Sequence, residues 1–147
     1  MTLVLIFPTV QFQEHLPKEW NQIVGCADVV PGGTGLKAYP FTSLVINVGC
    51  VTDVHMDPWD SSHCMVIPFG PMVGKGQDAW TEGDLCMAEV GVVVQLGNCQ
   101  PVIFLSSGLT HFNLNGKGQR HSLVLSTDKA LLPYRHHWND WSQHMQI

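Results

Sequence analysis

The feature that most constrains the fold of this chain is a series of short apolar segments separated by turn residues. Val, Ile and Leu dominate these segments, and clusters of Gly, Pro, Asn and Ser lie between them. The segments are 43–51, 63–69, 85–90, 91–96, 101–105, 111–114 and 120–127. Many short strands with regularly spaced turns are typical of a β-sandwich or barrel. We therefore expect a mainly β protein.

The part of the chain before these segments predicts one strand and one helix. Residues 3–7 form a short apolar run that Pro8 ends, and we interpret the run as a buried strand. Pro17 suits the first turn of a helix, and the apolar residues from Trp20 to position 24 share one helical face. At the other end of the chain, 131–145 is either a closing helix or a loose tail.

Length and composition exclude several classes of protein. The 147 residues predict a single domain, 1–147, because domains average roughly 150 residues. Apolar residues make up 45% of the chain and charged residues 13%, which excludes intrinsic disorder. Twelve acidic and seven basic residues give a formal charge of −5. This charge disfavours a nucleic-acid partner, because no cationic surplus exists to neutralise phosphates.

The cysteines and the N-terminus predict an intracellular protein, in the cytoplasm or nucleus. The five cysteines form no C-x-x-C pair, and each lies in or beside an apolar run. This pattern favours buried, reduced thiols. The first residues lack the basic segment of a secretory signal. No stretch approaches the roughly 18 apolar residues of a membrane helix, so we expect no membrane partner.

The candidate chemistry is carried by histidine, aspartate and arginine. His55 and Asp57 point to the same side of an extended segment, so they could hold one metal ion. His111 begins a predicted strand, and Arg120 and Ser122 lie on the next one. Two His and one carboxylate on one face of an iron leave three positions open, as in non-haem Fe(II) oxygenases. A keto acid and O2 would fill them, with the planar fork of Arg and a Ser hydroxyl binding the far carboxylate of the acid.

This pattern of H-x-D, a long gap, His, and R-x-S nine residues later resembles the Fe(II)/2-oxoglutarate-dependent dioxygenases. The match is closest to the TET/JBP-like branch of mushroom-forming fungi. The matching segments are 40–47, 55–57, 66–70, 109–114 and 118–124. The resemblance implies a double-stranded β-helix, or jelly roll, with its core at about 39–128 and one or two short helices outside the barrel. It also implies that His55, Asp57 and His111 bind the catalytic Fe(II), and that Arg120 and Ser122 hold the C5 carboxylate of 2-oxoglutarate.

The same resemblance implies a reaction. The co-substrates 2-oxoglutarate and O2 would be converted to succinate and CO2 while a substrate C–H is hydroxylated. In the TET/JBP-like branch that C–H belongs to the methyl group of a 5-methylpyrimidine base, which is flipped out of the stack. The charge of the chain favours an alternative, the same chemistry on a metabolite or free nucleoside. A second alternative is a non-enzymatic or cupin-like metal-binding jelly roll that does not use 2-oxoglutarate, against which Arg120 and Ser122 argue.

Further candidates surround this core set. Asn47 either reaches into the barrel toward the keto acid or is a hydrogen-bonded core amide. Trp59 and Trp80 flank the predicted mouth, where each either stacks on a planar substrate or packs on the barrel. Asn113 shares the inward face of His111 and so could contact substrate. Among the other histidines, we expect His121 to point away from the site.

Overall fold

The computed structural model describes residues 3–49, 51–70, 83–116 and 119–135, and these contain the complete α-helices α1 and α2, a helical turn at 132–135 and seven strands. The helices are α1 (Leu3–His15) and α2 (Pro17–Ala27), with short 3-10 helices at Gly33–Gly35 and Lys129–Leu131. The strands are β1 (Ser43–Val48), β2 (Cys64–Phe69), β3 (Leu85–Met87), β4 (Val92–Val94), β5 (Val102–Phe104), β6 (His111–Asn113) and β7 (His121–Ser126). Each strand lies inside one of the seven predicted segments, so the expectation of a mainly β chain is confirmed.

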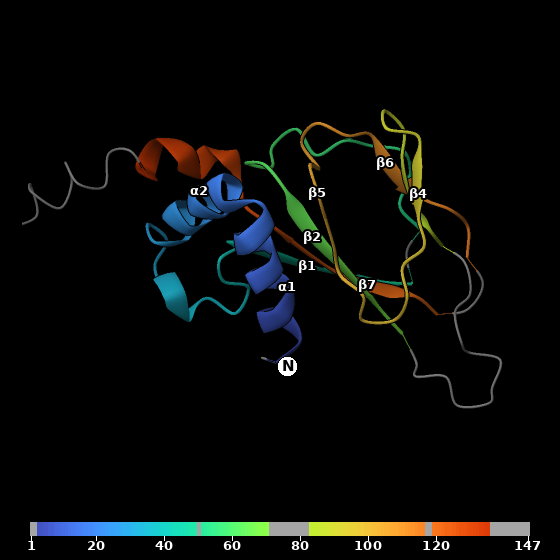
Figure 1. Ribbon diagram of the computed structural model, residues 1–147, viewed down its shortest axis with the longest axis horizontal. Helices are drawn as coiled ribbons and strands as arrows, with labels where there is room; N and C mark the ends of the chain where they lie inside the picture. Colours follow the sequence, from blue (N-terminus) through green and yellow to red (C-terminus); the bar gives the residue numbers. More distant parts are fainter. Residues whose placement is uncertain (1–2, 50, 71–82, 117–118, 136–147) are drawn as a thin grey trace, which may run out of the picture.

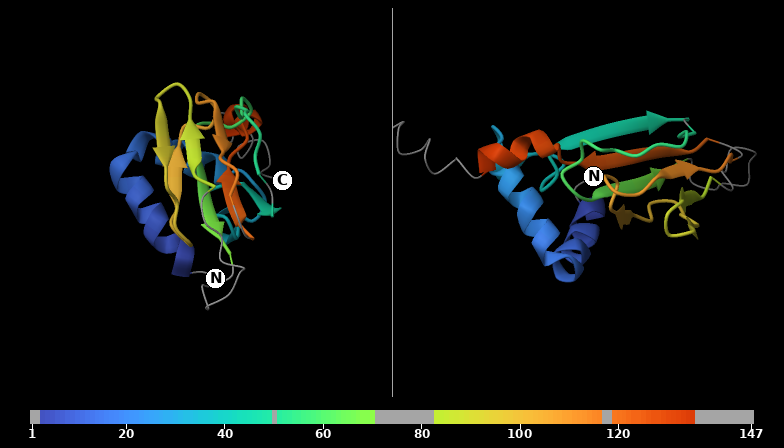
Figure 2. Two further views of the ribbon diagram at one scale, coloured as in Figure 1. Left: turned by 90° about the vertical axis from the view of Figure 1, so that its right-hand side faces the viewer. Right: turned by 90° about the horizontal axis from the view of Figure 1, so that it is seen from above.

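The strands form two antiparallel sheets. The larger has the order β1-β7-β2-β5 and the smaller the order β4-β3-β6. Figure 2 shows β1 at the outer edge of the larger sheet, beside β7. This order places the first strand of the barrel next to the last one. The segment that follows β1 and carries the H-x-D pair is thereby brought close to β6.

The inner face of the larger sheet packs against the smaller sheet. Side chains alternate along a strand, so Cys64 and Val66 of β2 point inward. They join Leu85 and Met87 of β3 and Phe104 of β5 in one apolar cluster. This cluster fills one part of the space between the sheets and leaves the rest for the candidate site.

The two helices cover the outer face of the larger sheet. Phe12 of α1 and Ile23 of α2 are fully buried against Met65, Ile67 and Leu125, which point outward from β2 and β7. Burying one such side chain contributes about 1.5–3 kcal/mol. Figure 1 shows both helices at one end of the molecule and β4 and β6 at the other. The helices therefore stabilise the sheet from the side opposite the candidate site.

The structure corrects one prediction in this region and confirms another. The segment 3–7, expected as a buried strand, forms the first turns of helix α1. Five apolar residues have no period that separates a strand from a buried helix. The residues that follow favour a helix over a strand, because Phe12 and Leu16 are spaced by about one helical turn and both pack on the core. The predicted helix beginning at Pro17 is present as α2.

The remaining expectations for the chain are met in part. Cys26, Cys64 and Cys86 are buried free thiols, whereas Cys99 is exposed in a turn, contrary to the prediction. Residues 132–135 are helical, and the rest of the C-terminal segment lies outside the described residues. None of the helices in the described part of the chain has the length and apolar character needed to cross a membrane.

Candidate metal centre

Two histidines are brought side by side by backbone pairing. His55 lies in the segment between β1 and β2, and His111 is the first residue of β6. The His55 N–H donates to the His111 carbonyl at 3.1 Å, and the His111 N–H donates to the His55 carbonyl at 2.8 Å. This isolated antiparallel bridge places the two ring centroids 4.2 Å apart. Residues 56 positions apart in the sequence therefore present their imidazoles to one point.

The carboxylate of Asp57 completes the group. Its Oδ1 lies 3.6 Å from His55 Nε2 and its Oδ2 lies 3.5 Å from His111 Nε2. One ligand atom from each of the three residues lies within 4.8 Å of the others. The three residues could therefore hold one ion together. The donor set, two imidazoles and one carboxylate, suits a non-haem Fe(II) centre with open positions.

The protonation of both rings is determined by backbone carbonyls. His55 Nδ1 lies 2.7 Å from the Asp53 carbonyl, and His111 Nδ1 lies 2.9 Å from the Leu109 carbonyl. A carbonyl can only accept, so each Nδ1 must carry the proton. In the neutral ring Nε2 is then the atom with the lone pair that can bind a metal, and both Nε2 atoms face the Asp57 carboxylate. Such support is what orients a histidine ligand in metal sites.

A buried serine holds the Asp57 backbone. The Asp57 N–H donates to the Ser106 carbonyl at 3.1 Å, and Ser106 is fully buried. The Ser106 hydroxyl donates to Asp60 Oδ2 at 2.5 Å. Burial raises the pKa of Asp60, and the hydrogen bond from Ser106 partly offsets that effect. The turn that carries Asp57 is therefore fixed to the loop after β5.

The three candidate ligands line one cavity of about 470 Å³ between the sheets. Asn47, Asn113 and Ser122 also line it. The Asn47 side-chain amide donates to the Ser122 hydroxyl at 3.4 Å, across the β1–β7 pair. The Asn113 amide donates to the Gly83 carbonyl at 3.1 Å. The cavity thus has a polar wall on β1 and β7 close to the histidine pair.

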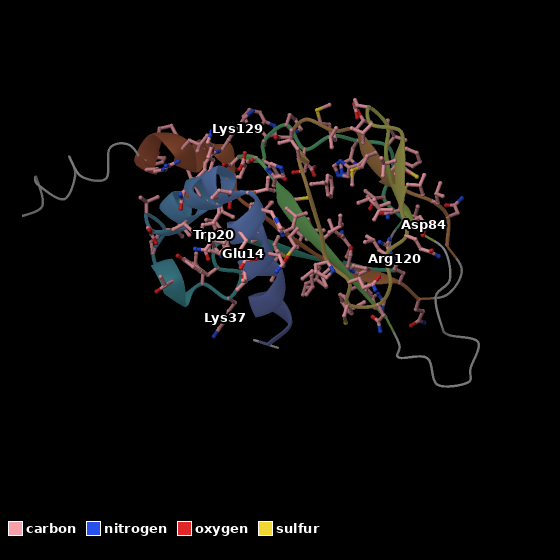
Figure 3. The ribbon with its side chains drawn as sticks, viewed as in Figure 1. Glu14, Trp20, Lys37, Asp84, Arg120 and Lys129 are labelled. Carbon is pink, nitrogen blue, oxygen red and sulfur yellow. The ribbon has the colours of Figure 1, made fainter. Side chains whose placement is uncertain are left out.

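Arg120 lies just beyond the residues that line the cavity. It precedes β7 by one residue, so its side chain shares the face of Ser122. Its Cδ passes 3.3 Å from the position that a Cβ on Gly83 would occupy. Burial lowers the pKa of Arg120, while the nearby Asp84 carboxylate acts in the opposite direction. Figure 3 shows Arg120 and Asp84 together at the end of the molecule that lies away from the helices.

Trp59 and His121 are not among the residues that line the cavity. Trp59 is 70% exposed, lies 4.5 Å from the Lys129 ammonium, and does not line the cavity. Trp80 lies outside the described residues. His121 contacts Phe69, with 5.3 Å between ring centroids, and points away from the cavity as expected. Sequence reasoning missed Asp53, Ser106 and the support they give through backbone carbonyls, which no side-chain pattern reports.

Comparisons with known proteins bear on the fold alone. No protein-family model and no curated protein matches the chain. The solved structure of NgTET1 in complex with 5mC DNA matches with a TM-score of 0.60 and 17% identity over 81% of this chain and 48% of that one. A Pseudomonas putida prolyl-4-hydroxylase matches with a TM-score of 0.44 and 22% identity, over 58% of this chain and 50% of that one. An oxidoreductase of the 2OG-Fe(II) oxygenase family from Burkholderia pseudomallei matches with a TM-score of 0.44 and 20% identity, over 65% of this chain and 46% of that one.

The fold is therefore a jelly roll of the kind found in 2-oxoglutarate oxygenases, as the sequence predicts. The chain spans about half the length of these solved structures. Within that fold it carries a His-Asp-His group whose ligand atoms converge.

Proposed function

We propose that this protein is an Fe(II)- and 2-oxoglutarate-dependent dioxygenase that hydroxylates a substrate C–H. The observation that carries the proposal is the convergence of His55, Asp57 and His111 on one point of a cavity in a jelly-roll fold. We further propose that about 39–128 forms the core of a single domain, and that it belongs to the TET/JBP-like branch that its sequence pattern resembles. The buried thiols support an intracellular location.

The chain's own residues have distinct roles in this proposal. His55 and His111 bind the metal through Nε2, because each Nδ1 is engaged by a carbonyl. Asp57 supplies the third ligand and one negative charge. When bound, Fe(II) supplies the activation of O2 that couples 2-oxoglutarate decarboxylation to hydroxylation. The three protein ligands leave the remaining positions for the co-substrates.

The co-substrate site follows from the residues on β7. Ser122 and Asn47 offer a hydroxyl and an amide to the keto acid from the cavity wall. Arg120 lies one step farther along the same strand face and supplies a guanidinium for the C5 carboxylate. A guanidinium binds a carboxylate through two parallel hydrogen bonds, which determines orientation as well as affinity.

Two substrate classes are supported by different observations. The fold likeness to NgTET1, solved with 5mC DNA, supports the methyl group of a 5-methylpyrimidine base, with Asn113 or Trp59 contacting the base. The cavity wall supports a metabolite or free nucleoside instead. Three aspartates line the cavity, Asp53, Asp57 and Asp60, and no Lys or Arg is among the described residues that line it. A polyanion gains nothing from such a wall.

Binding experiments test the metal and co-substrate sites. We expect the wild-type protein to bind Mn(II), a stand-in for Fe(II), in near-equimolar amount, and 2-oxoglutarate to raise the Tm only when metal is present. His111→Ala should lower metal affinity by more than the roughly 10–100-fold that follows from disturbing a residue that supports a ligand. Arg120→Ala should keep metal binding and weaken 2-oxoglutarate by about 10-fold or more, since hydrogen bonds to charged groups contribute about 1.5–3 kcal/mol. Unchanged metal affinity in His111→Ala would show the triad assignment to be wrong.

An activity measurement tests the reaction. Succinate release is measured with Fe(II), 2-oxoglutarate and O2 across 5-methylcytosine DNA, thymine-containing DNA, free nucleosides and candidate metabolites. We expect stimulation by one of these classes, with none in the His111→Ala protein. Metal and 2-oxoglutarate binding without any succinate release would favour the non-enzymatic jelly roll. Metal binding without any effect of 2-oxoglutarate would favour the cupin-like alternative.

A further inference from the structure

An exposed glutamate, Glu89, accepts two hydrogen bonds from Thr110, the residue that precedes His111. Glu89 lies in the turn between β3 and β4. Its Oε2 accepts the Thr110 backbone N–H at 2.7 Å, and its Oε1 accepts the Thr110 hydroxyl at 2.5 Å. The Thr110 carbonyl in turn accepts the Ala88 N–H at 2.9 Å. The backbone N–H, the carbonyl and the hydroxyl of Thr110 are thus all bonded to two consecutive residues of that turn.

The geometry of the peptide bond connects the Thr110–Glu89 hydrogen bonds to the His111 ring. The Thr110 N–H and the Leu109 carbonyl belong to the same peptide group, which is planar. That carbonyl is the acceptor for His111 Nδ1, at 2.9 Å. Glu89 therefore holds one side of a rigid plane whose other side determines the orientation and tautomer of the His111 ring. A rotation of this plane would remove the acceptor from Nδ1.

The negative charge of the Glu89 carboxylate also favours metal binding by His111. A carboxylate that accepts from an N–H polarises the peptide group and makes its carbonyl a stronger acceptor. A stronger acceptor on Nδ1 makes the other ring nitrogen a better metal donor. In this chain that nitrogen is His111 Nε2, which lies 3.5 Å from Asp57 Oδ2.

We propose that Glu89 is a positioning residue of the metal centre, which acts on His111 through the 109–110 peptide group. The inference rests on the proposed function for the identity of the metal ligands. Glu89 itself touches neither metal nor substrate. Its contribution is to keep His111 in one tautomer and one orientation before the metal arrives, which lowers the cost of assembling the site.

The test compares metal binding with folding in Glu89→Ala and Glu89→Gln. Mn(II) affinity is measured by calorimetry, and the apo protein is followed by its Tm and by two-bond ¹⁵N–¹H spectra of the histidine rings. We expect Glu89→Ala to weaken Mn(II) binding by about 10-fold and to mix the two His111 tautomers, with the apo Tm close to wild type. Glu89→Gln keeps only one oxygen acceptor for two donors and should lie between wild type and Glu89→Ala.

Two further variants separate positioning from a general charge effect. Glu14→Ala removes another exposed carboxylate, one that accepts from the Gln11 side chain on α1, and should leave Mn(II) affinity unchanged. Thr110→Val removes only the hydroxyl contact and keeps the backbone N–H bond, so its loss of affinity should be smaller than that of Glu89→Ala.

The possible results distinguish this inference from the proposed function. Wild-type Mn(II) affinity and an unchanged His111 tautomer in Glu89→Ala would overturn the positioning role while the metal site stands. A lower apo Tm with unchanged metal affinity would also overturn it, because Glu89 would then only stabilise the β3–β4 turn. Absence of Mn(II) binding by the wild-type protein would instead overturn the proposed function, together with the inference that depends on it.

Discussion

Gly83 lies directly beside the side chain of Arg120, the residue proposed to bind the co-substrate carboxylate. Its φ of 86° lies in the region that side chains rarely adopt. A Cβ at this position would also lie 3.3 Å from Arg120 Cδ and 3.7 Å from the Leu114 carbonyl. Its own carbonyl accepts from the Asn113 amide. A side chain here would therefore disturb the backbone, the arginine and one wall of the cavity.

Gly83→Ala is accordingly expected to have two effects. The positive φ should destabilise the folded protein by about 1–3 kcal/mol, measured by urea unfolding. The displaced Arg120 should weaken 2-oxoglutarate binding in the presence of Mn(II). Gly91→Ala is a matched control, since Gly91 has a φ of 61° and nothing within 4 Å of its Cβ position. Gly91→Ala should lose stability but keep 2-oxoglutarate affinity; equal affinities in both variants would contradict the placement of Arg120.

At the scale of elements, the helices and β2 meet around a half-buried histidine. His63 immediately precedes β2, and its ring lies 6.1 Å from that of Phe12 on α1. Its Nδ1 is 2.7 Å from the Ser62 hydroxyl. Burial lowers the pKa of His63 below its usual 6.5, and Glu19 of α2 opposes this. The packing of α1 on the sheet therefore favours a neutral imidazole.

This lowered pKa makes stability depend on pH in a defined direction. Below about pH 6.5 the unfolded chain binds a proton at His63 more readily than the folded protein does. The free energy of unfolding should therefore decrease as the pH is lowered from 6.5, until the pH is below the folded pKa of His63. Above pH 6.5 this contribution is constant. Urea unfolding of metal-free protein is measured between pH 5 and 8. The free energy of unfolding should decrease less on acidification in His63→Gln than in wild type. His15→Gln, at an exposed position on α1, should retain the wild-type slope, and identical slopes in all three proteins would contradict the role of His63.

At the scale of the whole molecule, the strand order assembles the site and the charge limits its partners. The β1-β7-β2 order and the smaller sheet bring six of the candidate residues around one cavity: Asn47, His55, Asp57, His111, Asn113 and Ser122. The sequence as a whole carries a formal charge of −5. Phosphate contacts supply most of the affinity of non-specific DNA binding. The overall charge therefore supports the proposed small substrate over duplex DNA.

We expect a 5-methylcytosine duplex to bind no more tightly than the roughly 10⁻⁴–10⁻⁶ M typical of non-specific complexes at physiological salt. Fluorescence anisotropy at several salt concentrations measures this. The salt dependence should be shallow, because few phosphates are neutralised. Binding in the nanomolar range with a steep salt slope would show a basic surface that the overall charge conceals, and would favour the nucleic-acid substrate.

The sequence predicted more of the strands than of the helices. Each strand carries its own signal, a short β-branched run bounded by turn residues, and this signal does not depend on the rest of the fold. Helix α1 carries no such signal in its first residues, because an apolar run of that length suits a strand and a buried helix equally. Phe12, later in the same helix, packs against Trp20 and Phe41, and these contacts exist only in the folded chain.

The sequence by itself determined which side chains are candidates for chemistry: His55, Asp57, His111, Arg120 and Ser122. Tertiary structure alone decided how these groups are supported and where they face. The Asp53 and Leu109 carbonyls and the backbone N–H of Thr110, which Glu89 binds, are all backbone groups. Every residue carries such groups, so no side-chain pattern can indicate which of them will be used. Pairing between distant segments makes that choice, and it exists only once the chain has folded.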